Sequence, residues 1–275
     1  MLLPAFVLAG CNDRNSGTDD TGGNKGPVYG EDFVETVSDL DMKMIYVEGG
    51  TFLMGATAEQ EDDAYDWEYP VREVTLAPFY IAECEVTQSQ WEKVMYTTIE
   101  SQAYMAGTSV YYGVGADYPM YYVSWEEAQA FCEMLSELTG KNYCLPTEAQ
   151  WEYAARGGNK SRGYKYSGSD DIEEVAWYMD NSETKNSASR VKTKQPNELG
   201  LYDMSGNVYE WCRDRYGNYD ADDTDNPAGP DSGFNRVLRG GSWDVNARTC
   251  RVSYRYYDDP DDRYYRGGFR VAVIP

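Results

Sequence analysis

The C-terminal segment from Val237 onward constrains the fold more than any other part of the sequence. It opens with Val-Leu-Arg-Gly-Gly-Ser-Trp and closes with Gly-Gly-Phe-Arg, and tyrosine and aspartate crowd the stretch between these two blocks. A strand that enters a core alternates apolar with polar residues, and this stretch does not. The sequence therefore predicts a displayed surface segment that is held at both ends by anchoring blocks.

The residue types of this segment suit molecular recognition. Tyrosine provides a large contact area at low entropic cost, and aspartate adds directional hydrogen-bond acceptors. The alternative is that several tyrosines pack on the neighbouring Arg255, Arg263 or Arg266 and stabilise the loop. We predict a ligand-binding surface made of Asp244, Asn246, Tyr254, Tyr256, Tyr257, Asp258, Asp259, Asp261, Asp262, Tyr264 and Tyr265.

The composition excludes several classes of function. The formal net charge of -23 and the pI near 4.3 exclude nucleic acid as a partner, because a phosphate polymer would be repelled. The absence of histidine excludes Ser-His-Asp and Cys-His catalysis, imidazole metal sites and a histidine general base. At 275 residues, the chain is long enough for one large irregular domain or two small ones.

The N-terminus resembles a bacterial lipoprotein signal. A short apolar run ends in Leu-Ala-Gly-Cys at Cys11, which resembles the site where such signals are cleaved before a cysteine that is then lipidated. The run is too short to span a bilayer. We expect residues 1–11 to be the signal, 12–40 a flexible tether and 41–275 the folded domain. The protein would then sit in the bacterial cell envelope, at the outer membrane or cell surface, and meet the membrane only through its lipid.

Local patterns predict several elements of the domain. Residues 44–47, 51–54 and 71–76 are expected as strands. A helix is expected after Thr87, and a Ser or Thr followed three residues later by Glu or Gln predicts helix starts at Ser124 and Thr147. From Gly158 to the end, little helix is expected. Trp243, Cys250 and Phe269 are expected to lie buried under the displayed segment.

Several blocks along the chain resemble the formylglycine-generating enzyme (sulfatase-modifying factor) family, and they occur in the family's order from Asp41 to the C-terminus. The resemblance implies one irregular, loop-rich α+β domain of C-type-lectin-like fold, with short strands and a few helices. Related iron-dependent sulfoxide synthases need a histidine cluster, so this branch is excluded. The blocks are Met44–Gly55, Phe79–Thr87, Val123–Ala128, Leu145–Gly158, Asn197–Trp211 and the two C-terminal blocks.

The resemblance also implies where the family's oxidase chemistry would lie. Family oxidases hold copper(I) between two cysteine thiolates, which suit a soft cation. Ser242 matches the active-site serine and Cys250 the second cysteine, but the first cysteine is replaced by Val245. One thiolate cannot provide two-sulfur coordination. We therefore expect no copper and no formylglycine generation, and assign Ser242 and Cys250 only as residual catalytic positions.

The stretch from Asp203 to Glu210 resembles the family's calcium loop. The resemblance implies a structural Ca²⁺ held by the Asp203 and Glu210 carboxylates and by the carbonyls of Met204, Gly206 and Val208, since Ca²⁺ prefers oxygen ligands. The alternative is that Asp203 caps a turn and Glu210 pairs with an arginine.

Cysteine number bears on redox state. Apart from Cys11, the chain has five cysteines, so at least one should be free in an oxidising compartment. Relatives often carry the positions of Cys212 and Cys250 together, and we predict a disulfide between them. Cys132 and Cys144 are a weaker candidate pair.

The tyrosine and aspartate positions also suggest a history. Family members commonly carry asparagine there, and one changed adenine converts an Asn codon to Tyr or Asp. Diversity-generating retroelements randomise adenines in this way near the end of a target gene, and their variable proteins use this fold. We therefore interpret the chain as a non-catalytic, surface-anchored protein that binds a protein or glycan ligand. A modifying enzyme with a remodelled site and a structural envelope lipoprotein remain alternatives.

Overall fold

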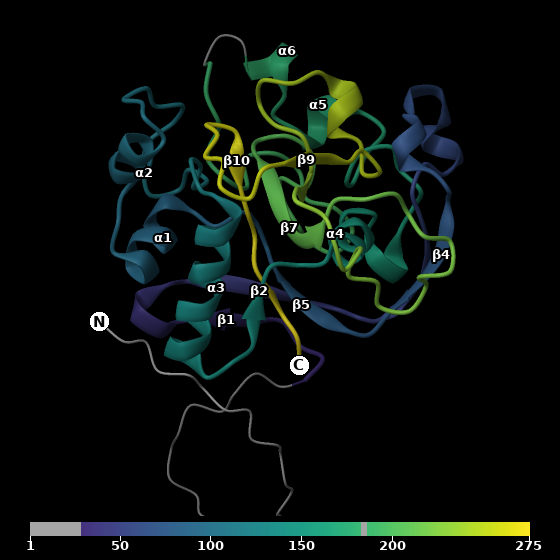
Figure 1. Ribbon diagram of the computed structural model, residues 1–275, viewed down its shortest axis with the longest axis horizontal. Helices are drawn as coiled ribbons and strands as arrows, with labels where there is room; N and C mark the ends of the chain where they lie inside the picture. The colour runs from purple at the N-terminus through teal and green to yellow at the C-terminus, as the bar shows by residue number, and fades with distance from the viewer. Residues whose placement is uncertain (1–28, 183–185) are drawn as a thin grey trace, which may run out of the picture.

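The computed structural model describes residues 29–182 and 186–275, so the predicted signal and the predicted lipidation site at Cys11 lie outside the described residues. The molecule is an α+β domain in which short strands alternate with helices and long loops (Figure 1). This is the predicted fold class. No helix in the described ranges is long and apolar enough to cross a bilayer.

The base of the molecule is a five-stranded antiparallel sheet in the order β1-β2-β5-β11-β6. The last strand in the sequence, β11, lies between β5 and β6, so the C-terminus returns to the N-terminal half of the chain (Figure 1). The sheet thereby fixes one end of the C-terminal segment. The strands are β1 Phe33–Glu35, β2 Met42–Val47, β5 Phe79–Ala82, β6 Tyr143–Cys144 and β11 Ala272–Val273.

A second sheet carries the C-terminal segment. Its order is β10-β7-β8-β9, with β10 parallel to β7 and the other pairs antiparallel. A separate two-stranded sheet pairs β3 with β4, and the predicted strands at 44–47, 51–54 and 71–76 are confirmed. The remaining strands are β3 Gly50–Met54, β4 Arg72–Leu76, β7 Tyr209–Arg215, β8 Arg236–Arg239, β9 Tyr256–Asp258 and β10 Gly267–Gly268.

Three helices begin at capping boxes, as the sequence predicts. The side chains of Thr87, Ser124 and Thr147 each accept a hydrogen bond from the backbone amide three residues later. The Gln or Glu side chain at that later position accepts one from the backbone amide of the capping residue. The last helix with more than four residues ends before Gly158, which confirms a second half poor in helix. The helices are α1 Gln88–Met95, α2 Ile99–Met105, α3 Trp125–Thr139, α4 Glu148–Ala155, α5 Ile172–Val175 and α6 Met179–Ser182. The 3-10 turns are η1 Val37–Asp39, η2 Ala58–Asp63, η3 Asp66–Glu68, η4 Gly158–Lys160 and η5 Ala247–Cys250.

The predicted C-terminal boundary of the tether, residue 40, is too late in the sequence. The last part of the predicted tether, from residue 33, forms β1 and η1, and β1 pairs with β2. Glu35 is buried and accepts hydrogen bonds from Lys141 (2.5 Å) and the Tyr143 hydroxyl (3.0 Å). Long-range pairing therefore orders a stretch whose local composition gives no sign of it.

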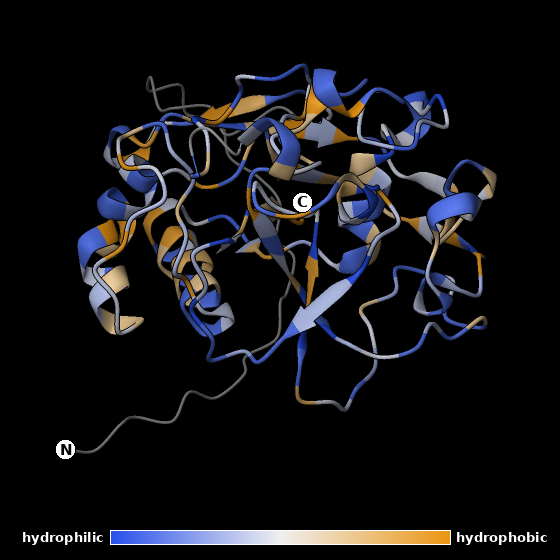
Figure 2. Cartoon of the chain, turned by 90° about the horizontal axis from the view of Figure 1, so that it is seen from above, coloured by the Kyte–Doolittle hydropathy of each residue, from blue (hydrophilic) through white to orange (hydrophobic). Residues whose placement is uncertain are grey.

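Aromatic side chains fill much of the core. Trp91 stacks on Phe131, and both rings meet Phe269 edge-on at 6.1 and 5.3 Å. The helices mix blue polar and orange apolar residues in Figure 2, as amphipathic helices packed against a core do. Since Phe269 lies in the closing block, aromatic packing holds the end of the C-terminal segment against α1 and α3.

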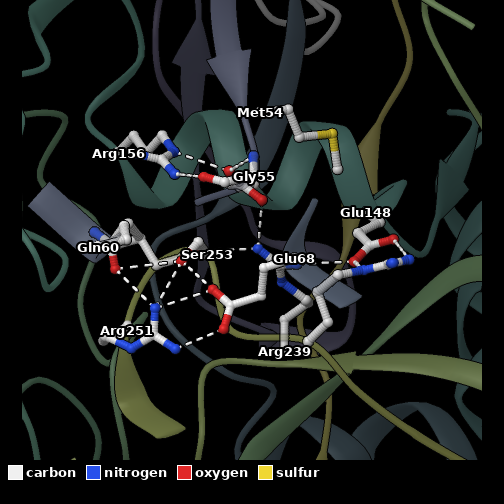
Figure 3. A network of polar contacts seen from close by, with 12 residues as sticks. Met54, Gly55, Gln60, Glu68, Glu148, Arg156, Arg239, Arg251 and Ser253 are labelled. Atoms are coloured by element: carbon white, nitrogen blue, oxygen red, sulfur yellow. Dashed lines mark hydrogen bonds and ion pairs between the residues drawn. The ribbon is translucent and has the colours of Figure 1, made fainter. Parts of the chain in front are cut away.

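Buried arginines are the second structural element of the interior. Arg239, Arg251 and Arg270 are each fully buried, and each pairs with a buried glutamate. Arg251 donates to both oxygens of Glu68, at 2.6 and 2.9 Å, and also to Gln60 and Ser253 (Figure 3). These bonds join the 55–71 connection between β3 and β4 to the segment that leads into β9.

Candidate functional site

The scaffold under the C-terminal segment is built as the sequence predicts. Trp243, Cys250 and Phe269 are all buried, with Trp243 only 4% exposed. The Trp243 ring packs against Tyr112 at 5.3 Å and Tyr265 at 5.9 Å. Together with the buried Arg251 and Arg270 pairs, these residues fix the path of the chain on both sides of the tyrosine- and aspartate-rich stretch.

Most of the predicted ligand-binding residues reach the surface. Tyr257 (45% exposed), Tyr264 (37%) and Asp261 are exposed, as is Asn246. Half-buried positions are Asp244, Tyr256, Asp258, Asp259, Asp262 and Tyr265. We call these ten residues the tyrosine-aspartate surface.

The prediction that Tyr254 belongs to the ligand-binding surface is wrong. Tyr254 is only 7% exposed, and its ring meets that of Tyr65 edge-on at 5.7 Å. The 55–71 connection covers this part of the segment because Arg251 and Ser253 bind Glu68 within it. Tyr254 is therefore part of the packing beneath the surface.

The tyrosines form two groups. In the first, Tyr256 stacks beside Tyr257 (6.0 Å), Tyr209 lies against Tyr256 (5.3 Å) and Tyr216 against Tyr257 (4.3 Å). Strand pairing causes this arrangement, since β9 lies beside β8, which in turn pairs with the β7 strand that begins at Tyr209. The group is a row of aromatic rings, with one stacked and two tilted contacts, that ends on the edge strand β9.

The second group surrounds Tyr265. Its ring lies 4.6 Å from Tyr112, and its hydroxyl donates to Asp244 (2.8 Å). Arg266 joins the two groups: its guanidinium lies 5.9 Å from the Tyr209 and Tyr265 rings and 3.5 Å from an Asp244 oxygen. Tyr265 therefore packs on an arginine, as expected if some of the tyrosines stabilise the loop. Tyr257 and Tyr264 are exposed.

The surface is acidic. Among the ion pairs of the described residues, none involves Asp258, Asp259, Asp261 or Asp262. Burial, with a contribution from Asp262, raises the pKa of Asp258 to about 6. Asp262 also accepts a hydrogen bond from the Tyr264 hydroxyl at 3.0 Å. Asp258 and Asp259 also accept backbone hydrogen bonds within the segment, so these carboxylates are partly satisfied by the chain itself and have no cationic partner in the described residues.

Neighbouring residues that the sequence analysis did not select extend this region. Tyr112 and the exposed Tyr111 (42%) come from the loop after α2, and Tyr104 (84% exposed) lies near the end of α2 itself. The hydroxyl of Tyr122 bonds to the Val110 carbonyl, and the Tyr122 amide bonds to the Tyr264 carbonyl, so this loop lies beside the C-terminal segment. Its tyrosine- and glycine-rich composition without periodicity is the signal that could have identified it.

The two residual catalytic positions, Ser242 and Cys250, are buried. Ser242 is fully buried and donates to Asp244 at 2.6 Å. Burial raises the pKa of the Cys250 thiol to about 12, so the group is a neutral thiol at physiological pH. Val245 is half-buried and packs against the hydrophobic core. Neither a thiolate nor a second sulfur is present at this position.

The predicted disulfide between Cys212 and Cys250 is wrong for this structure. Both are free thiols, and they belong to different hydrophobic clusters, Cys212 with Trp151 and Cys250 with Tyr166. Cys132 and Cys144 are also free. These cysteines are packed as small apolar side chains.

The predicted calcium ligands lie in the interior. Asp203, Met204, Gly206, Val208 and Glu210 are buried, and Glu210 is occupied by Arg270 (2.6 and 2.7 Å) and the Trp151 indole (2.7 Å). Asp203 accepts from the Lys192 amide, but its Oδ1 has no partner, which fits a cation. In the described part of the chain, no group of three or more acidic or cysteine side chains is arranged to hold a metal. Calcium stays a prediction that Asp203 supports and Glu210 does not.

Two cavities are lined by residues outside the tyrosine-aspartate surface. One of about 550 Å³ is lined by Phe52, Leu53, Tyr69 and Tyr153, near the 55–71 connection. Another of about 370 Å³ lies between β4, β7 and the loop after β7. None of the ten residues of the tyrosine-aspartate surface lines either cavity.

Comparisons with known proteins agree with this architecture. Residues 31–274 match the Sulfatase-modifying factor enzyme 1-like domain. The chain is 32% identical to the chaperone protein LppX of Paenibacillus barcinonensis (80% of this chain, 84% of that protein) and 31% identical to the formylglycine-generating enzyme of Streptomyces coelicolor (82% and 87%). The solved structure of Treponema denticola variable protein 1 has 30% identity and a TM-score of 0.76, covering 89% of this chain and 99% of its own. The chain belongs to the sulfatase-modifying factor enzyme 1-like family, and its sequence is similar to those of formylglycine-generating enzymes.

Proposed function

We propose that the protein is a non-catalytic binding protein whose tyrosine-aspartate surface contacts a protein or glycan ligand. The observation that carries the proposal is the contrast between Tyr257 and Tyr264, which are exposed, and Trp243, Arg251 and Arg270, which are buried directly around the segment. Exposed tyrosines on a rigid base match the composition of known binding surfaces. Loops on a fixed scaffold commonly carry recognition.

The catalytic positions support a non-catalytic role. The oxidase chemistry of the family needs two thiolates, whereas this chain offers one buried neutral thiol at Cys250 and an aliphatic side chain at Val245. Loaded with copper(I), the protein should not convert a cysteine-containing sulfatase peptide. Turnover that Cys250→Ala abolishes would contradict this part of the proposal.

The similarity to a variable protein supports diversification of the surface. We infer that a diversity-generating retroelement has altered the tyrosine and aspartate codons of β9 and the loop before β10. The motivation is that the positions most suited to contact are those reached from Asn codons by one adenine change. A near-identical repeat of this gene segment beside a reverse transcriptase gene should be present, and its absence would exclude the inference.

A lipid anchor in the bacterial cell envelope is the location that fits this role. The motivation is the Leu-Ala-Gly-Cys sequence at Cys11. Expressed with its full signal, the protein should partition into detergent and incorporate labelled fatty acid, and Cys11→Ser should abolish both. A Cys11→Ser protein that remains equally membrane-bound would show that another feature holds it there.

Calcium is proposed as a structural ion at Asp203. Two buried carboxylate oxygens, Asp203 Oδ1 and Oε1 of the neighbouring Glu85, accept no hydrogen bond. Since a bound ion stabilises only the folded state, chelation should lower the melting temperature of the native protein, and Asp203→Ala should remove the response. An unchanged melting temperature on chelation would reject the proposed calcium site.

The binding role is tested at the stacked tyrosines. The protein would first be screened against a bacterial glycan array and isolated envelope proteins, and the Kd of each partner measured. Tyr256→Ala with Tyr257→Ala should weaken binding by about 1–4 kcal/mol per useful contact while the melting temperature changes little. Tyr96→Ala, at an exposed tyrosine on the C-terminus of α1, is the matched control and should leave Kd unchanged. Equal affinity of all variants would reject the surface.

A further inference from the structure

A cavity of about 370 Å³ lies between β4, the start of α4, the end of β7 and the loop that follows β7. Its walls are strongly polar, with arginines and acidic residues on facing elements. Cavities of this size accept small molecules, and a few fixed polar groups usually decide which ones. The charges of the walls therefore indicate the chemistry of a ligand.

The inner wall contains a buried arginine without a counter-charge. Arg72 is only 8% exposed, and it has no ion pair among the residues the structure describes. One terminal nitrogen donates to the Asp220 carbonyl (2.6 Å), the other reaches only the Met54 sulfur (3.8 Å), and Nε has no partner. Buried charges are normally paired, so Arg72 leaves a positive charge and a donor unsatisfied.

The two buried carboxylates that line the cavity, Glu148 and Asp214, already have partners. Glu148 accepts two hydrogen bonds from Arg255, at 2.6 and 2.7 Å, and one from Arg239 at 2.8 Å. Asp214 accepts from the Glu148 amide at 3.0 Å, and burial raises the pKa of its carboxyl to about 7. Near neutral pH, much of Asp214 is therefore protonated and can donate a hydrogen bond instead of neutralising Arg72.

The mouth of the cavity has the opposite charge. Asp220, Asp223 and Asp231 line it, are exposed or half-buried, and form no ion pair in the described ranges. Tyr219 lies between the two regions, with Arg72 4.6 Å and Arg255 3.8 Å from its ring centre. The half-buried Arg215 also lines the cavity and donates to the Gly233 carbonyl, so three aspartates against one arginine leave the entrance with a net negative charge, while the inner wall is positive.

We propose that this cavity binds a small zwitterion, such as a free α-amino acid, with its carboxylate on Arg72 and its ammonium group facing Asp220, Asp223 and Asp231. A simple anion would be repelled by the entrance aspartates, and a simple cation would leave Arg72 unpaired. A zwitterion satisfies both ends. The proposal is independent of the tyrosine-aspartate surface and stands or fails separately from it.

Ligand chemistry provides the first test. The free L-amino acids are titrated singly into the full protein by calorimetry, and each that binds is compared with its des-amino carboxylate and its decarboxylated amine. At least one amino acid should bind, and both analogues should bind about tenfold more weakly, because each loses a charge-assisted contact. The proposal is overturned if no amino acid binds, or if either analogue binds as tightly as its parent.

Variants provide the second test. Arg72→Met should abolish binding, with folding checked by circular dichroism. Asp223→Asn, at a half-buried loop position, should lower the affinity for the amino acid several-fold but leave the affinity for its des-amino carboxylate unchanged. Asp222→Asn is the matched control, since Asp222 is exposed on the same loop but does not line the cavity. If Arg72→Met fails to fold, the aspartate pair decides: equal affinity of Asp223→Asn, Asp222→Asn and wild type would reject the site.

Discussion

Glu148→Gln is expected to lower the free energy of unfolding by about 3–5 kcal/mol, because it leaves the buried Arg255 without a counter-charge and Arg239 with Glu152 alone. Glu148 lies between Arg239 and Arg255, and all three are nearly or fully buried. Burial alone would raise the pKa of Glu148, but Arg255 and Arg239 lower it overall. Chemical denaturation at neutral pH measures the loss.

The pH dependence of this loss has a definite sign. The folded-state pKa of Glu148 lies below its ordinary value of 4.5, so the ion pairs contribute fully above that value. Their contribution is lost as the pH falls through the folded-state pKa. The difference between wild type and Glu148→Gln should therefore shrink in acid.

Glu83→Gln is the matched control. Glu83 also bridges two cations, Lys43 at 3.1 Å and Lys192 at 3.0 Å, but both lysine side chains are more than 40% exposed. Exposed pairs typically contribute between 0 and about 1 kcal/mol. Similar losses for Glu83→Gln and Glu148→Gln would show that burial of the arginine pairs does not determine their effect.

Trp243→Ala should destabilise the domain by about 3–5 kcal/mol, the usual result of replacing a buried aromatic residue with a cavity. Trp243 packs on Tyr112 and Tyr265, so its loss should also release Tyr265 from its place beside Asp244. Urea denaturation measures the first effect. Amide hydrogen exchange of the peptide that contains Tyr265, compared between the variant and wild type, reports the second.

Trp67→Ala is the control for this substitution. Trp67 is 42% exposed and stacks on Tyr65 at 4.5 Å, so its removal opens no enclosed cavity. Its loss should be about 0.5–1.5 kcal/mol, the range for an aromatic pair. A loss as large as that of Trp243→Ala would mean that Trp243 is not the anchor of the segment.

The buried arginine pairs and the tyrosine-aspartate surface are connected. Arg251 and Arg255 lie on either side of the buried Tyr254, and Arg255 immediately precedes Tyr256. Their glutamate partners come from η3 and α4. Rigid bonds beneath the segment allow residues on top of it to vary without loss of the fold. This division suits a protein whose contact residues change while its scaffold stays constant.

The sequence by itself determined what depends on neighbours along the chain. Thr87, Ser124 and Thr147 start helices because each cap bonds to a residue three positions away. The anchoring blocks around Trp243 and Phe269 also identified the family and the fold, since their order along the chain is specific. Local hydrogen bonds and an ordered set of motifs can be read without knowing what lies opposite in space.

Only the tertiary structure decided which side chains meet across long separations. Tyr254 is buried by Tyr65, almost two hundred residues earlier, and its exposed neighbour Tyr257 is not, although the two have the same local sequence character. Cys212 and Cys250 lie in separate clusters, and Arg72 is left without a carboxylate. Burial and charge pairing depend on the three-dimensional path of the chain, because desolvation and Coulomb energies follow distance in space and not distance in sequence.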